Sequence, residues 1–484
     1  MKVVIVGALA GFFLLPSAFA QQAPWGRADI PISGRDRVYA ADQTSNTVSV
    51  IDPSANKLLG VIRLGDPVPG ALSALYKGQL LVHGLGYSPD SKTLAVVSIA
   101  SNSITLIDTA TNKVKGIVYV GRSPHEAFFT PNGRELWVTV RGEDYVSVID
   151  PMRMREMRRI RLANGPGMTM FGPDGRYGFV CSSFTTELTV VDTVSNQIIK
   201  RVPQTSPFCP NIAVSPENDE VWITLKDVGK AQVFRAKPPF EQIALLDTGP
   251  ITNHVNFANN RNGKFAYLTI GGANEVKAYR RGAKPELVAT IPVGDLPHGI
   301  WPSGDGTRVY VALENGEHAV AIDTLSNKVI ADIPIGQTTQ ALVYVPGAVP
   351  NGDGTANLMP LGVAGEAFHI EMLPPSGAGS TGRATVAVNS LGVIDLLQIA
   401  VAGLQPVQEY QLFLVDSLRK PDATRVGLAK FKTWPNGAAI AQAIGPLRTV
   451  VAASGGAASQ QAVQRYLVVI PIGSNQPVLQ QRMP

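Results

Sequence analysis

Four histidines are the residues of this chain best suited to chemistry. His83 and His125 lie 42 residues apart, and His254 and His298 lie 44 residues apart, in a chain of 484 residues. An imidazole binds transition metals through a ring nitrogen and can donate or accept a proton near neutral pH. If the fold brings these side chains together, they could bind a metal ion, a haem-like cofactor or an anionic ligand.

The usual catalytic motifs are missing from the chain. It has no Gly-x-Ser-x-Gly nucleophile motif, no glycine-rich phosphate loop with its lysine, and no His-Glu-x-x-His zinc motif. Its two cysteines form no Cys-x-x-Cys pair, which excludes that redox motif and a conventional c-type haem attachment. An enzyme built from loops of different repeats would need none of these motifs, so catalysis is not excluded.

Two short markers recur in step along the chain. An aliphatic residue followed by aspartate occurs at Ile51-Asp52, Ile107-Asp108, Ile149-Asp150, Val191-Asp192 and Ile322-Asp323, and the second, third and fourth of these aspartates are 42 residues apart. A turn marker occurs at Pro89-Asp90, Pro131-Asn132-Gly133, Pro173-Asp174-Gly175, Pro216-Glu217, Asn262-Gly263 and Asp305-Gly306. A fixed period of this length is typical of repeat architectures.

Each repeat contains four short segments with the alternation of half-buried strands. In one repeat they are Ala127–Phe129, Leu136–Val140, a segment ending at Asp150, and Arg159–Leu162. Proline and glycine suit the tight turns, and the aspartate after the aliphatic residue can accept hydrogen bonds from nearby backbone amides. We therefore interpret the repeated aspartates as structural, although aligned carboxylates could also bind a metal.

Four strands in every repeat predict a seven-bladed β-propeller over residues 37–346. The first blade has only three strands of its own, whereas Gln340–Pro346 is a lone strand after the seventh blade. We expect this late strand to complete the first blade and close the ring, which removes exposed sheet edges. An insertion at Pro67–Leu80 accounts for the 56 residues between Asp52 and Asp108.

The repeat resembles the YVTN-type propeller repeat of exported bacterial and archaeal proteins. The segments that carry the resemblance are Tyr310–Leu313, Val320–Asp323, Ser326–Lys328, Ile333–Gly336 and Pro297–Gly299. Such repeats occur in surface-layer proteins, periplasmic binding propellers, lactonases and subunits of redox proteins, so the resemblance implies a fold and no single function. Two repeats depart from it, with Phe234-Arg235 and Tyr279-Arg280 in place of the aliphatic-Asp pair.

The start of each inner strand of a propeller faces the mouth of the central channel, so equivalent residues there form a ring, here called the rim. Counting six residues back from the turn proline places on the rim His83, His125, Gly167, Pro210, His298 and Gln340, joined by His254 if its turn is one residue longer. In YVTN-type repeats a histidine at this position occurs in proteins of many functions, where it can simply satisfy a buried carbonyl. Glu126 and Asp295 could add carboxylates to the rim or be solvated, whereas His318 and His369 lie elsewhere.

The two cysteines fall in neighbouring blades. Cys181 lies toward the end of the second strand of the fourth blade, and Cys209 lies at the start of the inner strand of the fifth. Strand direction places both residues at the same face of the propeller. A disulfide between the blades is therefore expected in an oxidising compartment.

After Pro346 the repeat gives way to a turn-rich linker, 347–360, and a second domain, 361–484. The expected strands are Phe368–Leu373, Ala384–Val388, Val393–Val401, Tyr410–Val415, Val426–Phe431, Ala438–Ile444, Thr449–Ala452 and Tyr466–Ile470. They predict a small immunoglobulin-like β-sandwich. Part of it, 403–448, is similar to the extracytoplasmic sandwich of anti-sigma-K-type factors through Tyr410–Val415, Gly427, Phe431 and Gly445–Leu447, a similarity that implies fold and no regulatory role.

Residues 1–20 have the pattern of a signal peptide. Lys2 precedes the apolar run Val3–Leu15, and Ala18-Phe19-Ala20 is a cleavage pattern. A transmembrane anchor is the alternative, but the run is short for a bilayer, and no later segment has about 20 consecutive apolar residues. We expect a periplasmic or secreted protein with a lead-in at 21–36 and no membrane span after cleavage.

The formal net charge of +5 is small for this length, and the basic residues are dispersed apart from the run between Met152 and Arg161. That run is typical of a solvated strand face, so a nucleic-acid partner is not favoured.

These features favour an all-β exported propeller of the bacterial envelope that binds a ligand or a protein partner at its histidine-bearing mouth, with the sandwich orienting or anchoring it. The alternative is a lactonase-like hydrolase with a metal ion on the rim, or an accessory subunit of a periplasmic quinone- or haem-dependent redox system. No cofactor is predicted, and a metal ion at the four histidines is an open alternative. An enzyme needs these histidines to lie together with carboxylates around a cavity large enough for a metal ion. A binding protein could instead have a wide, water-filled mouth. A mouth filled by Pro67–Leu80 would favour a structural role.

Overall fold

The computed structural model describes residues 30–65, 76–362, 367–379, 381–390, 394–419, 425–447 and 465–483. Within these residues the chain forms seven four-stranded sheets and one eight-stranded sheet. The expected signal peptide, most of the lead-in, most of the insertion at Pro67–Leu80 and the expected strand at Thr449–Ala452 lie outside the described residues.

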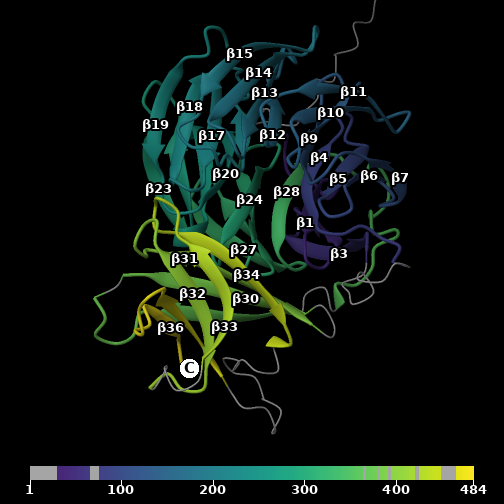
Figure 1. The fold of residues 1–484 in the computed structure, drawn as a ribbon. Helices are drawn as coiled ribbons and strands as arrows, with labels where there is room; N and C mark the ends of the chain where they lie inside the picture. The colour runs from purple at the N-terminus through teal and green to yellow at the C-terminus, as the bar shows by residue number, and fades with distance from the viewer. Residues whose placement is uncertain are drawn as a thin grey trace, which may run out of the picture.

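Each four-stranded sheet is one blade, which runs from an inner strand at the central channel to an outer strand at the edge (Figure 1). Blade 2 contains β4 (Val82–Tyr87), β5 (Thr93–Ser98), β6 (Ser103–Asp108) and β7 (Val114–Tyr119). Blade 3 contains β8 (Pro124–Phe129), β9 (Leu136–Val140), β10 (Tyr145–Asp150) and β11 (Arg155–Arg161). Blade 4 contains β12 (Pro166–Phe171), β13 (Tyr177–Ser182), β14 (Glu187–Asp192) and β15 (Gln197–Pro203).

The remaining complete blades follow the same order. Blade 5 contains β16 (Ile212–Val214), β17 (Glu220–Leu225), β18 (Lys230–Arg235) and β19 (Gln242–Asp247). Blade 6 contains β20 (Thr252–Asn260), β21 (Gly263–Ile270), the short 3-10 helix η2 (Gly271–Ala273), β22 (Glu275–Arg280) and β23 (Glu286–Pro292). Blade 7 contains β24 (Pro297–Pro302), β25 (Arg308–Leu313), β26 (His318–Asp323) and β27 (Lys328–Pro334).

Blade 1 joins the two ends of the propeller. The late strand β28 (Thr339–Val345) lies beside β1 (Arg37–Asp42), followed by β2 (Thr47–Asp52) and β3 (Lys57–Arg63). The pairing is antiparallel and runs from Arg37 opposite Val345 to Ala41 opposite Ala341. The predicted closure of a seven-bladed ring is therefore confirmed.

Burial explains why these segments form stacked blades. All six residues of β8 are buried, because both faces of an inner strand pack against neighbouring blades, whereas the outer strand β11 alternates exposed and less exposed residues. Trp137 is fully buried and packs edge-on against Phe171 of the next blade, with ring centroids 5.0 Å apart. On β11 the basic residues pair with nearby acids, for example Arg158 with Glu135 at 2.6 Å, which fits the expected solvated face.

The repeated aspartates make the expected turn contacts. Asp52 accepts a hydrogen bond from the backbone N–H of Ser54, and Asp192 accepts two from Val194 and Ser195. Comparable bonds are made by Asp108, Asp150 and Asp323. These contacts agree with a structural role for the recurring carboxylates.

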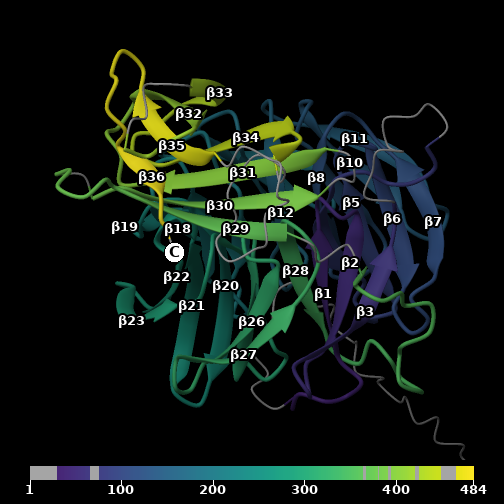
Figure 2. The same ribbon diagram turned by 90° about the horizontal axis from the view of Figure 1, so that it is seen from below.

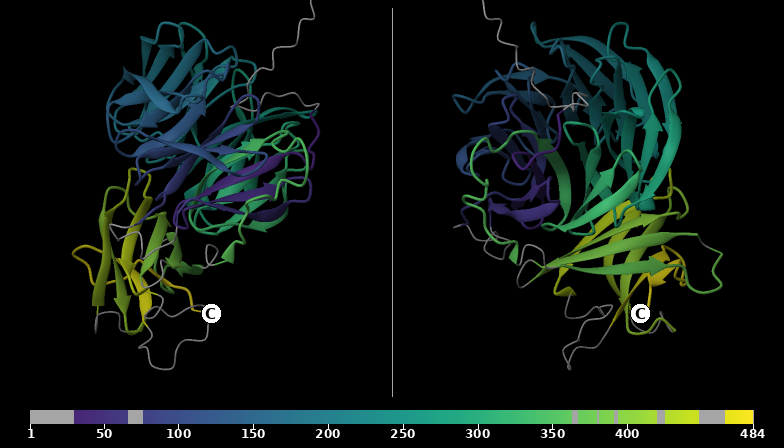
Figure 3. Two further views of the ribbon diagram at one scale, coloured as in Figure 1. Left: turned by 90° about the vertical axis from the view of Figure 1, so that its right-hand side faces the viewer. Right: turned by 180° about the vertical axis from the view of Figure 1, so that it is seen from behind.

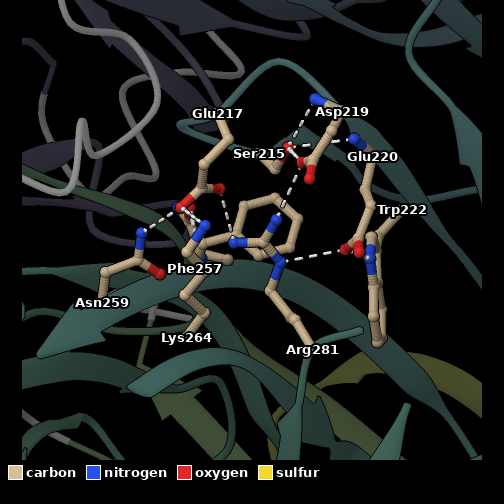
Figure 4. A network of polar contacts seen from close by, with 10 residues as sticks. Ser215, Glu217, Asp219, Glu220, Trp222, Phe257, Asn259, Lys264 and Arg281 are labelled. Atoms are coloured by element: carbon tan, nitrogen blue, oxygen red, sulfur yellow. Dashed lines mark hydrogen bonds and ion pairs between the residues drawn. The ribbon is translucent and has the colours of Figure 1, made fainter. Parts of the chain in front are cut away.

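The two blades that lack the aliphatic-Asp pair are joined by an ion-pair network (Figure 4). Arg281 of blade 6 has a side chain only 2% exposed, and its guanidinium contacts Glu217 at 2.9 Å, Asp219 at 3.1 Å and Glu220 at 2.9 Å, all from blade 5. It also lies over the ring of Phe257. This network stands at the end of the propeller opposite the mouth, beside the turn between β16 and β17.

The C-terminal region forms one further sheet beside the propeller (Figures 2 and 3). Its strands are β29 (Ala367–Leu373), β30 (Arg383–Ser390), β31 (Asp395–Ala402), β32 (Glu409–Val415), β33 (Arg425–Lys432), β34 (Ala439–Gly445), β35 (Tyr466–Pro471) and β36 (Leu479–Gln481). Hydrogen bonds join them in the order β33-β32-β35-β36-β29-β30-β31-β34. The two end strands, β33 and β34, pack beside each other, so the sheet is nearly closed around its own apolar core.

The all-β architecture is thus confirmed, whereas an immunoglobulin-like pairing into two separate sheets is not, because the eight described strands form one hydrogen-bonded sheet. Strand β36 was not expected from the sequence. It has only three residues, too few for the alternation of buried and exposed side chains to be evident. In the described part of the chain, no helix is long and apolar enough to cross a membrane.

Candidate functional site

The strand register fixes which residues stand on the rim. In blades 3 and 7 the inner strand begins opposite the end of the second strand, with Pro124 opposite Val140 and Pro297 opposite Leu313. The next residue of the inner strand, which lies in a β-bulge, is the rim residue. From blade 1 to blade 7 the rim is therefore Gln340, His83, His125, Gly167, Pro210, Asn253 and His298.

The register corrects the expectation for His254. Thr252 pairs with Ile270, so Asn253 takes the rim position of blade 6 and His254 lies one place further along the strand, where blade 3 has Glu126. The turn is indeed longer, but the extra residues extend the hairpin to the pair Asn260 and Gly263 at the far end and leave the start of the strand in register. His254 still reaches the mouth, since its ring centroid lies 4.7 Å from that of His298.

A second ring, here called the collar, stands beside the rim. Its residues directly follow the second strand of each blade, and each backbone N–H donates to the residue that precedes the inner strand. From blade 1 to blade 7 the collar is Gln43, Ile99, Arg141, Ser183, Lys226, Gly271 and Glu314. Sequence reasoning missed the collar, although the signal was present: Arg141 and Lys226 each stand ten residues after a turn proline, Pro131 and Pro216.

Backbone conformation sets the collar contacts. The residue that accepts the collar N–H has a left-handed conformation in six blades, at Leu81, Ser123, Gly165, Ile251, Leu296 and Thr338. Ile251 is β-branched and has a φ of 57°, a conformation that costs such residues energy. Both Ile251 and Leu296 are fully buried against the C-terminal sheet, which supplies packing that offsets this cost.

Two rim histidines of blades 2 and 3 point at each other. His83 Nε2 lies 3.0 Å from His125 Nε2, His83 Nδ1 lies 2.7 Å from Gln43 Oε1, and His125 Nδ1 lies 2.8 Å from the carbonyl of Gly167. Because a carbonyl only accepts, Nδ1 of His125 carries the proton and its Nε2 presents a lone pair to His83. An imidazole fixed in this way by a backbone carbonyl is the usual arrangement of a metal ligand.

Glu126 completes a cluster of three donors. One ligand atom from each of His83, His125 and Glu126 lies within 4.8 Å of the others, and all three side chains are buried. Burial raises the pKa of Glu126 to about 8 and lowers the pKa of both histidines well below 6.5. The histidines are therefore neutral near pH 7, the form that binds metals, and a bound cation would favour the carboxylate of Glu126.

The second histidine pair is part of a polar network. His298 Nδ1 lies 2.9 Å from Glu314 Oε2, and Gln340 hydrogen-bonds both groups. Burial would raise the pKa of Glu314, but His298, Lys226 and Gln340 outweigh it and hold that pKa at about 2. Burial lowers the pKa of His298, so this imidazole is mainly neutral beside a carboxylate. Glu314 thus supplies the negative charge of the mouth.

The C-terminal sheet covers part of the mouth. Gln398 Nε2 donates to Glu314 Oε1 at 2.7 Å, and Asn436 Nδ2 donates to the carbonyl of Lys226 at 3.1 Å. Further contacts between the sheet and the mouth join Asn389 to Thr338, Arg383 to Gly272, and Asn315 to Thr385. An apolar cluster of Ile251 and Leu296 with Ala400, Ala402 and Ala438 seals this side. The described contacts lie over blades 5, 6 and 7 and the junction with blade 1.

The channel beneath the rim is narrow. Its cavity of about 10 Å³ is lined by Glu126, His254 and apolar residues such as Leu85 and Trp301, and it has room for about one water molecule or ion. Of the four histidines, His254 lines this cavity, together with the carboxylate of Glu126.

The remaining residues singled out in the sequence have clear places. Cys181 and Cys209 form the expected disulfide between blades 4 and 5, with a Cα–Cα distance of 6.0 Å. His318 contacts the carbonyl of Gly316, and His369 of the C-terminal sheet pairs with Glu317 of blade 7 at 2.6 Å. Asp295 accepts a hydrogen bond from Asn274 Nδ2 at 2.8 Å.

Comparisons with known proteins support the fold. No protein-family model matches the chain, and no curated protein matches it by sequence, so the YVTN-type assignment is not confirmed. The periplasmic gluconolactonase of Pseudomonas aeruginosa is similar in structure, with a TM-score of 0.52, 17% identity, and coverage of 64% of this chain and 99% of that one. A functionally unknown protein from Desulfotomaculum acetoxidans DSM 771 has a TM-score of 0.54, 11% identity, and coverage of 63% and 98%.

A Kuenenia stuttgartiensis hydrazine synthase structure covers 55% of this chain and 90% of its own, at 20% identity and a TM-score of 0.49. At such identities the first two likenesses show the propeller fold alone, and the third carries no weight. The function must therefore be argued from the mouth itself.

Proposed function

We propose that this protein is an exported binding protein of the bacterial envelope, which holds a ligand at the mouth of its propeller with a divalent transition metal ion between His83, His125 and Glu126. The observation that carries the proposal is the pair of facing Nε2 atoms 3.0 Å apart. In a tetrahedral zinc site with Zn–N distances of about 2.0–2.1 Å, two imidazole nitrogens stand about 3.3 Å apart. A small adjustment of the two rings would admit the ion.

The surroundings of the three donors support a built site. Gln43 and the carbonyl of Gly167 orient the two imidazoles, and the N–H of Leu85 orients the carboxylate of Glu126. The disulfide, together with the signal-peptide pattern of residues 1–20, supports export to an oxidising compartment. The role of the metal ion is to add a charged ligand contact to a mouth that the C-terminal sheet partly covers.

Elemental analysis and zinc titration of the purified mature protein test the proposal. We expect one equivalent of metal per chain, and a loss of zinc affinity of about a hundredfold or more in His83→Ala and His125→Ala. His298→Ala is the matched control, because it removes a rim histidine of the other pair and should keep the metal. A protein that binds no metal, or a His298→Ala variant that loses as much affinity as His125→Ala, would contradict the assignment.

A lactonase-like hydrolase is the second candidate, favoured by the same cluster, because a metal ion with open positions can activate water. The gluconolactonase resembles this chain in fold. A pH-stat assay of glucono-lactone hydrolysis by the zinc-loaded protein distinguishes the two functions. Turnover that disappears in His125→Ala would favour the hydrolase, and its absence in a protein that binds zinc would favour the binding protein. The redox-accessory alternative rests on the sequence resemblance alone.

A further inference from the structure

The collar holds two cations, Lys226 and Arg141, that form no ion pair within the described residues. Lys226 is only 6% exposed, yet within the described residues its ammonium group contacts just the ring of Phe208, at 5.9 Å. Arg141 is half-buried, and its guanidinium lies over the rings of Phe184 and Phe208, at 5.7 and 5.9 Å. Burying a charge without a partner costs free energy, so such groups are retained where a ligand completes them.

The nearby acids are engaged elsewhere. Asp227, which follows Lys226, accepts a hydrogen bond from Ser206, and Asp144 pairs with Arg161. Glu314 acts on Lys226 through space, but the two do not form an ion pair. The collar of the mouth thus has two cations, Arg141 and Lys226, and Glu314 as its one carboxylate. A ligand with an anionic group complements the two cations.

Aromatic rings surround the two cations. Phe208 lies beneath both charged groups, and its ring stands edge-on to Trp434 of the C-terminal sheet, with centroids 5.8 Å apart. Phe184 of blade 4 is 52% exposed, so part of its ring is open to a ligand. These rings offer an apolar wall to the body of a ligand whose charged end meets the cations.

We infer that Arg141 and Lys226 form a binding site for a small organic monocarboxylate with an apolar or aromatic body, enclosed by Phe184, Phe208 and Trp434. Arg141 is suited to a two-pronged contact with the carboxylate, and Lys226 supplies the second charge from the floor of the mouth. The inference rests on the proposed binding role and names its ligand class. The site lies on the collar beside the rim, since Arg141 directly follows Val140, which pairs with Pro124, the residue before His125.

Calorimetric titration with benzoate tests the inference, with benzamide, acetate and inorganic phosphate as comparison probes. We expect benzoate to bind more tightly than each of the three, and Lys226→Met and Arg141→Gln to weaken benzoate binding tenfold or more. Lys200→Met, which removes an exposed lysine of the outer strand of blade 4, is the matched control and should bind normally. Trp434→Phe should reduce the change in tryptophan fluorescence on benzoate binding by a larger factor than it reduces the affinity for benzoate.

The experiment is run on metal-free and zinc-loaded protein and on His125→Ala. Benzoate binding that survives in His125→Ala supports the carboxylate site even where the metal assignment fails, so the two proposals can fail separately. Equal binding of benzamide would overturn recognition of the charge, and tighter binding of phosphate would overturn the monocarboxylate class. Absence of benzoate binding to folded protein, or full affinity in Lys226→Met and Arg141→Gln, would overturn the site itself.

Discussion

At the end of the propeller opposite the mouth, Arg281 lies between three carboxylates, whereas at the mouth Lys226 and Arg141 form no ion pair within the described residues. Carboxyl groups differ in the same way. Burial raises the pKa of Glu217, but Arg281 and Lys264 outweigh it and bring the pKa below its usual value. At the mouth end of β1, Asp42 accepts hydrogen bonds from the hydroxyls of Thr47, Ser49 and Thr339 and from the backbone N–H of Ser49, and burial raises its pKa to about 7.

This difference separates charge that stabilises the fold from charge that awaits a partner. A buried ion that meets opposite charges holds two blades together, and its removal leaves those charges unpaired. A buried ion without opposite charges lowers stability, so its presence at the mouth calls for another explanation. Ligand binding provides that explanation, and substitutions at the two ends of the propeller test the comparison.

The largest effect is expected at the compensated end. Arg281→Met should lower the free energy of unfolding by about 3–5 kcal/mol, because Glu217, Asp219 and Glu220 would be left facing one another. Urea unfolding measures the change. Lys264→Met is the matched control, since this lysine is 55% exposed and pairs with Glu217 alone, and its loss should cost about 1 kcal/mol or less. Equal losses of the free energy of unfolding in the two variants would show that burial of the cation does not determine how much its ion pairs stabilise the fold.

An intermediate effect is expected from the carboxyl at the mouth. The pKa of Asp42 is about 7 when folded and 3.8 in its ordinary state, so the unfolded chain loses this proton first as the pH rises. The stabilising contribution of protonated Asp42 is fully present below about pH 4 and is lost as the pH rises to about 7. Asp42→Asn removes this dependence, and the difference between the two proteins should change by about 2–4 kcal/mol over that range.

Unfolding curves of the native protein and Asp42→Asn at pH 4, 5.5 and 7 provide the measurement. The native protein should lose stability relative to the variant with each step in pH. A constant difference would mean that the pKa of Asp42 is the same in the folded and unfolded chain, and a change in the opposite direction would mean that folding favours its ionised form.

The smallest effect is expected at the uncompensated cation. Lys226→Met keeps the length of the side chain and removes a buried charge that lacks an ion-pair partner in the described residues, so the free energy of unfolding should stay the same or rise by about 1 kcal/mol. Thermal unfolding without added ligand measures it. A loss of more than about 1 kcal/mol in the free energy of unfolding would show that Lys226, like Arg281, stabilises the fold. It would contradict the distinction between the two ends of the propeller.

Much of the propeller was predictable because local sequence patterns specify the strands and turns of each blade. The alternation in Leu136–Val140, the turn at Pro131-Asn132-Gly133 and the aspartate at Asp150 each specify one step of the same sheet. The closure by Gln340–Pro346 was also predictable, because a lone strand at one end and an incomplete blade at the other can satisfy only each other. The C-terminal sheet was less predictable, since its strands pair in an order that local patterns do not encode.

The site was predictable only in part. Counting residues found six of the seven rim positions, but it assigned His254 instead of Asn253 to the rim of blade 6, because the count assumed that the longer turn shifts the whole strand. The collar went unnoticed because its seven residues share no residue type and include apolar, neutral polar, positive and negative side chains. Only their common contact with the residue before the inner strand reveals them as one ring.

The sequence alone determined the number of blades, their four-stranded composition and the likelihood of a bridge between Cys181 and Cys209, because these follow from periodic patterns along the chain. The tertiary structure decided which way the side chains of the mouth face, and that Gln398 and Trp434 of the C-terminal region contact Glu314 and Phe208. The physical reason is that pairing and turns are short-range properties, whereas burial, pKa shifts and unpaired charge depend on residues brought together from opposite ends of the chain.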